Sequence, residues 1–164
     1  MRLFYERYVG YLTAVCSRYV PDPAAVKDIL QDAFLRIFDS VGRFEYRGEG
    51  SVKAWVRRIV VNGALKHLQA SGRLSYRDDL PEMADEPEDL PPLDVPPELV
   101  QRLIKELPDG YRTVFNLFVF EEKSHKEIAQ LLGIKEDSSA SQFFRARKLL
   151  ARQIKAYLQE HEER

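Results

Sequence analysis

One short segment, residues 77–98 (RDDLPEMADEPEDLPPLDVPPE), most constrains how this chain can fold. It holds six of the nine prolines and carries 9 acidic residues against 1 basic residue. Proline removes a backbone donor and resists helix formation, and like charges repel one another. The segment predicts an extended linker, with a well-ordered loop packed on a domain as the alternative. Either structure divides the chain into blocks of about 75 and 65 residues, which bury modest cores.

The net charge of -1 conceals an uneven distribution. Residues 1–76 carry 12 basic and 7 acidic residues, a net +5, while residues 77–98 carry -8. Residues 99–164 carry 12 basic and 10 acidic residues, a net +2. Two basic blocks therefore flank an acidic one, and this asymmetry is a better guide to partners than the total.

The sequence shows no membrane-spanning stretch, no secretory signal and only one cysteine, and these features limit the expected compartment and metal chemistry. No stretch approaches the roughly 18 consecutive apolar residues of a membrane-spanning helix. Residues 1–8 alternate charge and aromatics and lack the pattern of a secretory signal. The single cysteine, Cys16, excludes an intramolecular disulfide and a multi-cysteine zinc site. We expect a cytoplasmic protein with no metal and no cofactor.

The first block shows apolar stripes at helical spacing over three segments, about 4–20, 22–41 and 51–70. Asp22 suits an N-cap, Gly42 a helix stop, and Ser51 the cap of the third helix. The stripes consist of Phe4, Tyr8, Tyr11, Leu12, Val15 and Tyr19; of Val26, Ile29, Leu30, Ala33, Phe34, Ile37 and Phe38; and of Val52, Trp55, Val56, Ile59, Val60 and Ala64.

The second block predicts helices over about 99–107, 111–120, 124–132 and 137–160. Pro108 stops the first helix, Ser124 caps the third, and Gly133 allows a tight turn before the last. A short capped helix, a turn and a basic helix form the pattern of a helix-turn-helix. No segment alternates at period two for long enough to predict a strand. The expected fold is all-α, with two small helical domains.

Basic side chains concentrate on two of these helices. Helix 51–70 carries Lys53, Arg57, Arg58 and Lys66 with no acid. The last helix has no acid between its capped start and Glu160, and it carries Arg145, Arg147, Lys148, Arg152 and Lys155. Such clusters attract phosphate, although a solvated helix face is the usual meaning of a run of charge. The missing acids and the recognition position of the last helix favour nucleic-acid binding.

Particular side chains suit contacts to bases. On the last helix, Ser139, Gln142 and Arg145 are three residues apart on one face, and Gln pairs with adenine and Arg with guanine. Lys148 and Arg152 continue this face toward phosphates. The predicted buried stripe opposite consists of Phe143, Ala146, Leu150, Ile154 and Tyr157.

The first block offers a different chemistry, which suits unpaired bases. Phe44, Tyr46, Arg47 and Trp55 mix aromatic rings with a cation, and bases stack on aromatic side chains. Asn62 lies on the polar face of the helix, where it can contact a base edge. A plain core role for Trp55 is the alternative, because Trp55 also lies on the apolar stripe.

Two other function classes are less well supported. An enzyme is disfavoured because His67, His125 and His161 have no metal-ligand spacing and no phosphate-binding Gly-rich loop is present. Cys16 lies in an apolar stripe, which indicates a buried thiol and not a nucleophile. An ordinary DNA-binding regulator that uses only the helix-turn-helix remains the alternative, but it leaves the first block unexplained.

The order of these motifs resembles the small, extracytoplasmic-function group of RNA polymerase sigma factors. In the first block, the segments that resemble sigma domain two are FYERYVGYLTAVCSRYV, AAVKDILQDAFLRIFDSVGRF and RGEGSVKAWVRRIVVNGALKHL. In the second block, the segments that resemble sigma domain four are LPDGYRTVFNLFVFEEKSHKEIAQLLGI and SQFFRARKLL. The resemblance implies domain two over residues 1–73, the acidic linker over 74–98 and domain four over 99–164.

The resemblance also implies roles for particular residues. Core RNA polymerase would dock on the outer face of helix 22–41, at Asp28, Gln31, Asp32, Leu35 and Arg36. The melted minus-ten element would contact Phe44, Tyr46, Arg47, Lys53, Trp55, Arg57, Arg58, Asn62 and Lys66. The duplex minus-thirty-five element would contact Ser139, Ser141, Gln142, Arg145, Lys148 and Arg152.

The function implied by the resemblance is promoter-specific transcription initiation with core polymerase, and the chain itself would make no chemical bond. An anti-sigma factor is a further class of partner, whose binding surface no motif in this sequence marks.

Overall fold

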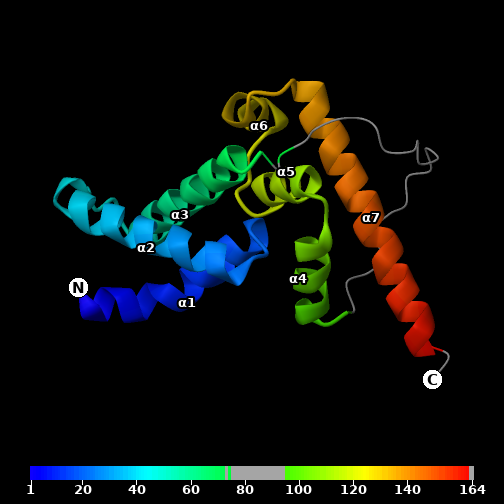
Figure 1. Cartoon of the computed structure of the whole chain (residues 1–164), viewed down its shortest axis with the longest axis horizontal. Helices are drawn as coiled ribbons and strands as arrows, with labels where there is room; N and C mark the ends of the chain where they lie inside the picture. Colours follow the sequence, from blue (N-terminus) through cyan, green and yellow to red (C-terminus); the bar gives the residue numbers. More distant parts are fainter. Residues whose placement is uncertain (73, 75–94, 163–164) are drawn as a thin grey trace. The chain divides into compact units, whose positions relative to one another are not determined.

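The computed structural model describes residues 1–72, 74 and 95–162, and within these residues it contains helices and no strand (Figure 1). The prediction of an all-α fold is confirmed. The chain divides into two units, Met1–Arg73 and Leu74–Arg164. The predicted linker lies almost wholly outside the described residues. No helix within the described ranges is long and apolar enough to cross a membrane.

Unit one contains three mutually packed α-helices, α1 (Arg2–Tyr19), α2 (Pro23–Ser40) and α3 (Ser51–Ala70), with a 3₁₀ turn η1 (Val41–Arg43) after α2. These bounds agree with the predicted stripes to within two residues. The fully buried side chains are Leu12, Val15, Cys16 and Tyr19 of α1, Ile37 of α2, and Val56, Val60 and Ala64 of α3. Each helix buries one apolar stripe because a three-helix bundle presents one side of every helix to its core.

The ends of these helices follow local chemistry, with one correction. Asp22 caps α2 as predicted, since its carboxylate accepts the backbone N–H of Ala24 at 3.1 Å. Ser51 was expected to cap α3, and this prediction is wrong, because Ser51 is already helical and Gly50 is the cap. Gly50 has φ +82°, a left-handed conformation that glycine adopts without steric cost. The Ser51 hydroxyl instead donates to the carbonyl of Gly48 at 2.8 Å.

Unit two contains α4 (Pro97–Glu106), α5 (Asp109–Val119), α6 (His125–Leu132) and α7 (Glu136–Glu162). Helix α7 packs against all three of the others. Its buried residues Ala146, Leu150 and Ile154 share a core with residues of α4 and α5. The buried residues of that core on the other helices are Leu99, Leu103, Ile104, Tyr111 and Phe115.

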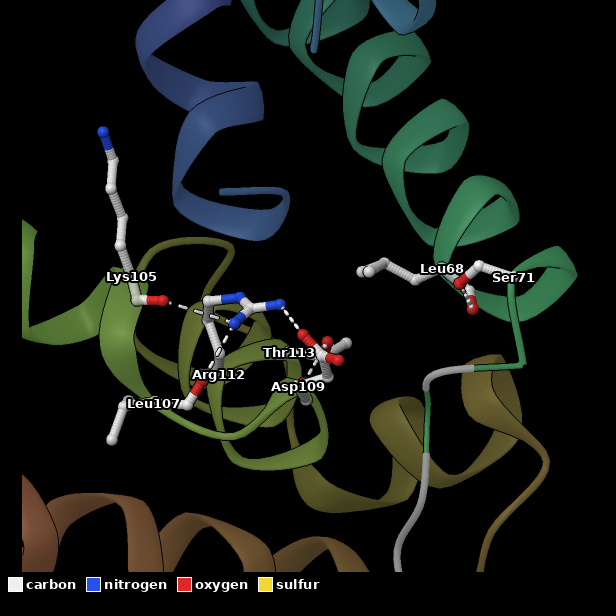
Figure 2. Close-up of polar contacts among 7 residues, drawn as sticks. All are labelled: Leu68, Ser71, Lys105, Leu107, Asp109, Arg112 and Thr113. Carbon is white, nitrogen blue, oxygen red and sulfur yellow. Dashed lines mark hydrogen bonds and ion pairs between the residues drawn. The ribbon is translucent and has the colours of Figure 1, made fainter. Parts of the chain in front are cut away.

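A buried arginine joins α4 to α5. One guanidinium nitrogen of Arg112 donates to the carbonyl of Leu107 at 2.8 Å and to that of Lys105 at 3.4 Å, and the other pairs with the carboxylate of Asp109 (Figure 2). The last carbonyls of a helix have no partner within it. Arg112 therefore satisfies the end of α4 from the first turn of α5.

Candidate nucleic-acid interface

The turn between α6 and α7 is built from local hydrogen bonds. The Ser124 hydroxyl accepts the backbone N–H of Glu127 at 3.1 Å, and the Glu127 carboxylate accepts the backbone N–H of Ser124 at 3.1 Å. These two bonds form a capping box. The Ser124 hydrogen bonds, the backbone bond first, hold the pKa of Glu127 below its usual value. Gly133 then ends α6 at φ +68°, and the chain turns into α7.

An aromatic cluster fixes the start of α7 against α5 and α6. The His125 ring stacks on Phe118 with centroids 4.6 Å apart, and Phe118 lies 4.4 Å from the Phe143 ring. The Nδ1 atom of His125 is 2.9 Å from the hydroxyl of Ser139. Residues of α5 and α6 thus contact the first turns of α7, the predicted recognition helix. These contacts fix the direction of α7 relative to α6.

The predicted exposed face of α7 is only partly correct. Ser139 is 0% and Gln142 is 1% exposed, so neither side chain lies on an accessible polar face. The physical reason is the helical repeat. Ser139 and Gln142 lie seven and four residues before the buried Ala146, so they belong to the same buried side of α7. Extending the predicted stripe backward by these steps would have identified both residues.

Lys148 also departs from the prediction, because its side chain is 5% exposed. Its ammonium lies 5.9 Å from the ring centroid of Phe144, one turn earlier. Three predicted minus-thirty-five residues remain at least partly accessible: Ser141 and Arg145 are half-buried and Arg152 is exposed. These three share one side of α7, because they are four and seven residues apart.

In unit one, the predicted minus-ten residues that belong to α3 separate onto two sides of that helix. Trp55, Arg58, Asn62 and Lys66 are three or four residues apart and follow one face. The ring of Trp55 stacks on Phe44, with centroids 4.6 Å apart and planes at 29°. Trp55 is half-buried, so it is neither a plain core residue nor fully exposed.

This stacked pair lines a shallow hollow of about 610 Å³, which we call the Trp55 hollow. Arg43, Arg47 and Arg58 line it together with Glu45. Arg47 and Glu45 are 3.5 Å apart and both are largely exposed, so their pairing is weak. Aromatic rings beside several guanidinium groups suit a single strand, whose bases stack and whose phosphates pair with cations. Arg43 is an addition that the sequence-based set did not contain.

The other side of α3 carries Lys53 and Arg57, which turn toward α1. The Arg57 guanidinium donates to the hydroxyl of Tyr11 at 3.2 Å, and the Lys53 ammonium lies 4.4 Å from the Tyr11 ring centroid. The sequence placed Tyr11 in the core stripe of α1, but its side chain is only half-buried. The structure therefore shows that Tyr11 of α1 contacts two of the predicted minus-ten residues, Lys53 and Arg57.

The predicted docking face of α2 is exposed at all five positions, Asp28, Gln31, Asp32, Leu35 and Arg36. Leu35 is 63% exposed. Together with Gln31 it borders a groove of about 650 Å³ between α1 and α2, whose lining includes Tyr5, Leu30 and Phe34. An exposed leucine beside an apolar groove is typical of a protein-binding surface.

Comparison with known proteins assigns both units. The family model described as Sigma-70 region 2 matches residues 4–74, and the model described as Sigma-70, region 4 matches residues 98–150. Region 2 therefore covers α1, α2 and α3, and region 4 runs from the start of α4 into α7. The chain belongs to the sigma-70 family.

Relatives that match most of this chain place it more finely within the sigma-70 family. The RNA polymerase sigma-H factor of Pseudomonas aeruginosa is 27% identical over 167 residues, which cover 94% of this chain and 86% of the relative. The ECF RNA polymerase sigma-E factor of Escherichia coli K12 is 28% identical over 165 residues, covering 93% of this chain and 85% of the relative. The resemblance to the extracytoplasmic-function group is confirmed.

A solved structure supports the fold of this sigma factor. The co-crystal structure of the sigma factor RpoE in complex with the anti-sigma factor NepR from Bartonella quintana matches with a TM-score of 0.53 at 20% identity. The match covers 94% of this chain and 98% of that chain.

Proposed function

We propose that this chain is an alternative sigma factor that binds core RNA polymerase and directs transcription initiation at promoters with its own minus-ten and minus-thirty-five elements. One observation carries the proposal: regions 2 and 4 of the sigma-70 family occur in order on one chain. Relatives that align over 85–86% of their own length are named RNA polymerase sigma factors. The chain acts in the cytoplasm with the polymerase, which performs the chemistry.

Region 2 divides its work between two surfaces. The Leu35 face and the neighbouring groove bind the polymerase, because they combine an exposed apolar side chain with polar neighbours. The Trp55 hollow takes the melted minus-ten strand, with bases against Phe44 and Trp55 and phosphates near Arg47 and Arg58. Binding an unstacked base stabilises the open strand, so recognition and melting are coupled.

Region 4 contacts the duplex minus-thirty-five element through the accessible side of α7. Arg145 contacts a base edge, and Ser141 and Arg152 contact the backbone. The buried positions of Ser139 and Gln142 support a structural role for these two residues. An anti-sigma factor is a further partner; the related RpoE in the solved complex binds one.

Run-off transcription with purified core polymerase and a promoter library tests the proposal. We expect one promoter class to be selected, and Arg145→Ala to weaken duplex binding by about 1–3 kcal/mol and relax the preference at one position. Leu35→Asp should reduce co-purification with core, while Leu3→Asp, an exposed leucine of α1, should not. A chain that never associates with core polymerase would contradict the proposal and favour a regulator that acts alone.

A further inference from the structure

The groove between α1 and α2, which we call the α1–α2 groove, has the size and lining of a small-molecule site. Its volume of about 650 Å³ falls within the range of about 300–1,000 Å³ that ligand pockets occupy. Eight of its eleven lining residues are apolar or aromatic, and the other three are Thr13, Lys27 and Gln31. An apolar lining with a few polar groups that orient the ligand is typical of such sites.

The groove is long, and its two ends differ in chemistry. Along α2 its lining runs from Pro23 to Phe38, a length of about 22 Å at about 1.5 Å per residue. Aromatic rings line one end, where the Phe34 centroid lies 4.8 Å from that of Tyr5 and 6.0 Å from that of Phe38. Lys27 lies toward the other end, near the start of α2. The groove therefore suits an elongated molecule with an apolar tail and one polar head.

The charge of the groove favours an anionic head. Among the described residues that line it, Lys27 is the one that carries a charge. Lys27 and Gln31 are four residues apart on one side of α2 and both are exposed, so an ammonium and an amide can donate to the same carboxylate. Acids that neighbour lining residues in the sequence are not part of the lining: Glu6, Asp22, Asp28, Asp32 and Asp39.

The apolar part of the lining suits an alkyl chain. Val26, Leu30 and Phe34 are 5–8% exposed and form the floor of the groove, whereas Tyr5 is 46% and Leu35 is 63% exposed at its edges. A chain of methylenes between these edges removes apolar surface of both molecules from water. An extended peptide fits less well, because its backbone N–H and C=O groups need hydrogen-bond partners that this lining does not supply.

We propose that the α1–α2 groove binds one long-chain carboxylate, with its alkyl chain toward the aromatic end and its carboxylate at Lys27 and Gln31. The groove and Leu35 belong to the surface that binds core polymerase in the proposed function. A bound carboxylate therefore covers part of that surface and excludes the polymerase, a consequence that rests on the proposed function. The chain would then join core polymerase less readily when free long-chain carboxylates accumulate.

Isothermal titration calorimetry of the full chain with decanoate, laurate and myristate, each below its critical micelle concentration, tests the site. We expect one molecule per chain and an affinity that rises about two- to fourfold for each added methylene, at most the equivalent of about 0.8 kcal/mol. Lys27→Gln should weaken laurate binding by about 1.5- to 5-fold, as the loss of an exposed ion pair does. The same variant should leave the affinity for dodecanol, which has no charge, unchanged.

Matched variants separate the groove from general binding of amphiphiles. Leu35→Asp should weaken laurate binding by about tenfold, because it removes apolar surface and adds a like charge. Leu3→Asp, at a leucine of α1 that is 82% exposed and outside the groove, should not. Lys126→Gln, at an exposed lysine of α6, is the control for Lys27→Gln. All four positions are exposed, so circular dichroism should show that each variant folds.

Co-purification with core polymerase tests the consequence. Saturating laurate should reduce the amount of chain bound to core, and the same concentration of decanoate should reduce it less. If laurate does not bind, or binds equally to the unmodified chain and to the Lys27→Gln and Leu35→Asp variants, the site is refuted and the sigma function stands. If laurate binds in the groove and association with core is unchanged, the exclusion of polymerase is refuted. If the chain never joins core without carboxylate, the proposed function fails, and calorimetry still decides the site.

Discussion

Replacing Ser139 by alanine tests whether this residue positions α7 or contacts DNA. Its hydroxyl is fully buried and lies 2.9 Å from Nδ1 of His125. Losing such a hydrogen bond costs about 0.5–1.5 kcal/mol net, and more when the remaining partner stays unsatisfied. Alanine recovers up to about 0.5 kcal/mol through its higher helix propensity. We expect Ser139→Ala to lower the free energy of unfolding of unit two by about 1 kcal/mol.

Ser141→Ala is the matched control, since it makes the same change two residues away at a half-buried position. It should change stability by less than about 0.5 kcal/mol, as most surface substitutions do. The effects on DNA should be reversed: Ser141→Ala weakens binding to the minus-thirty-five duplex, and Ser139→Ala leaves it nearly unchanged at temperatures where the unit is folded.

Denaturant titrations can assign the loss of stability to one unit. Trp55 is the single tryptophan and lies in unit one, so its fluorescence monitors that unit, while far-ultraviolet circular dichroism monitors both. The Ser139→Ala effect should appear in the dichroism transition and not in the fluorescence. If Ser139→Ala kept full stability and lost affinity for the duplex, Ser139 would be a DNA contact and the positioning role would be wrong.

Two further predictions concern single residues of the fold. Gly133→Ala should destabilise unit two by about 1–2 kcal/mol, because Gly133 has the left-handed φ of +68°. Gly10→Ala on α1 should instead stabilise unit one by up to about 1 kcal/mol, because an added Cβ there meets nothing within 4 Å and alanine has the higher helix propensity. Equal shifts of the same sign in thermal unfolding would contradict this reasoning. Burial raises the pKa of the Cys16 thiol to about 12, so a disulfide reagent at pH 8 should label Cys16 only after denaturation. Rapid labelling of the folded chain would contradict this prediction and show that the core of unit one opens readily.

Local patterns predicted the helices because their causes lie within a few residues of one another. The capping box pairs Ser124 with Glu127, three residues later, and the stripe of Ala146, Leu150 and Ile154 follows from the helical repeat alone. The same repeat assigns Ser139 and Gln142 to the buried side. The prediction failed there because it weighed their polar chemistry above their position in the stripe.

The sequence by itself determined the all-helical fold, the helix-turn-helix and the concentration of cations on two helices, because periodicity, capping and charge are properties of neighbouring residues. Only the tertiary structure decided which of those cations share a surface. Arg57 meets Tyr11 across 46 positions of the chain, and Phe44 stacks on Trp55 from the preceding loop. Such contacts depend on how α1 and the loop before α3 pack against α3, and packing of distant segments has no periodic trace in the sequence.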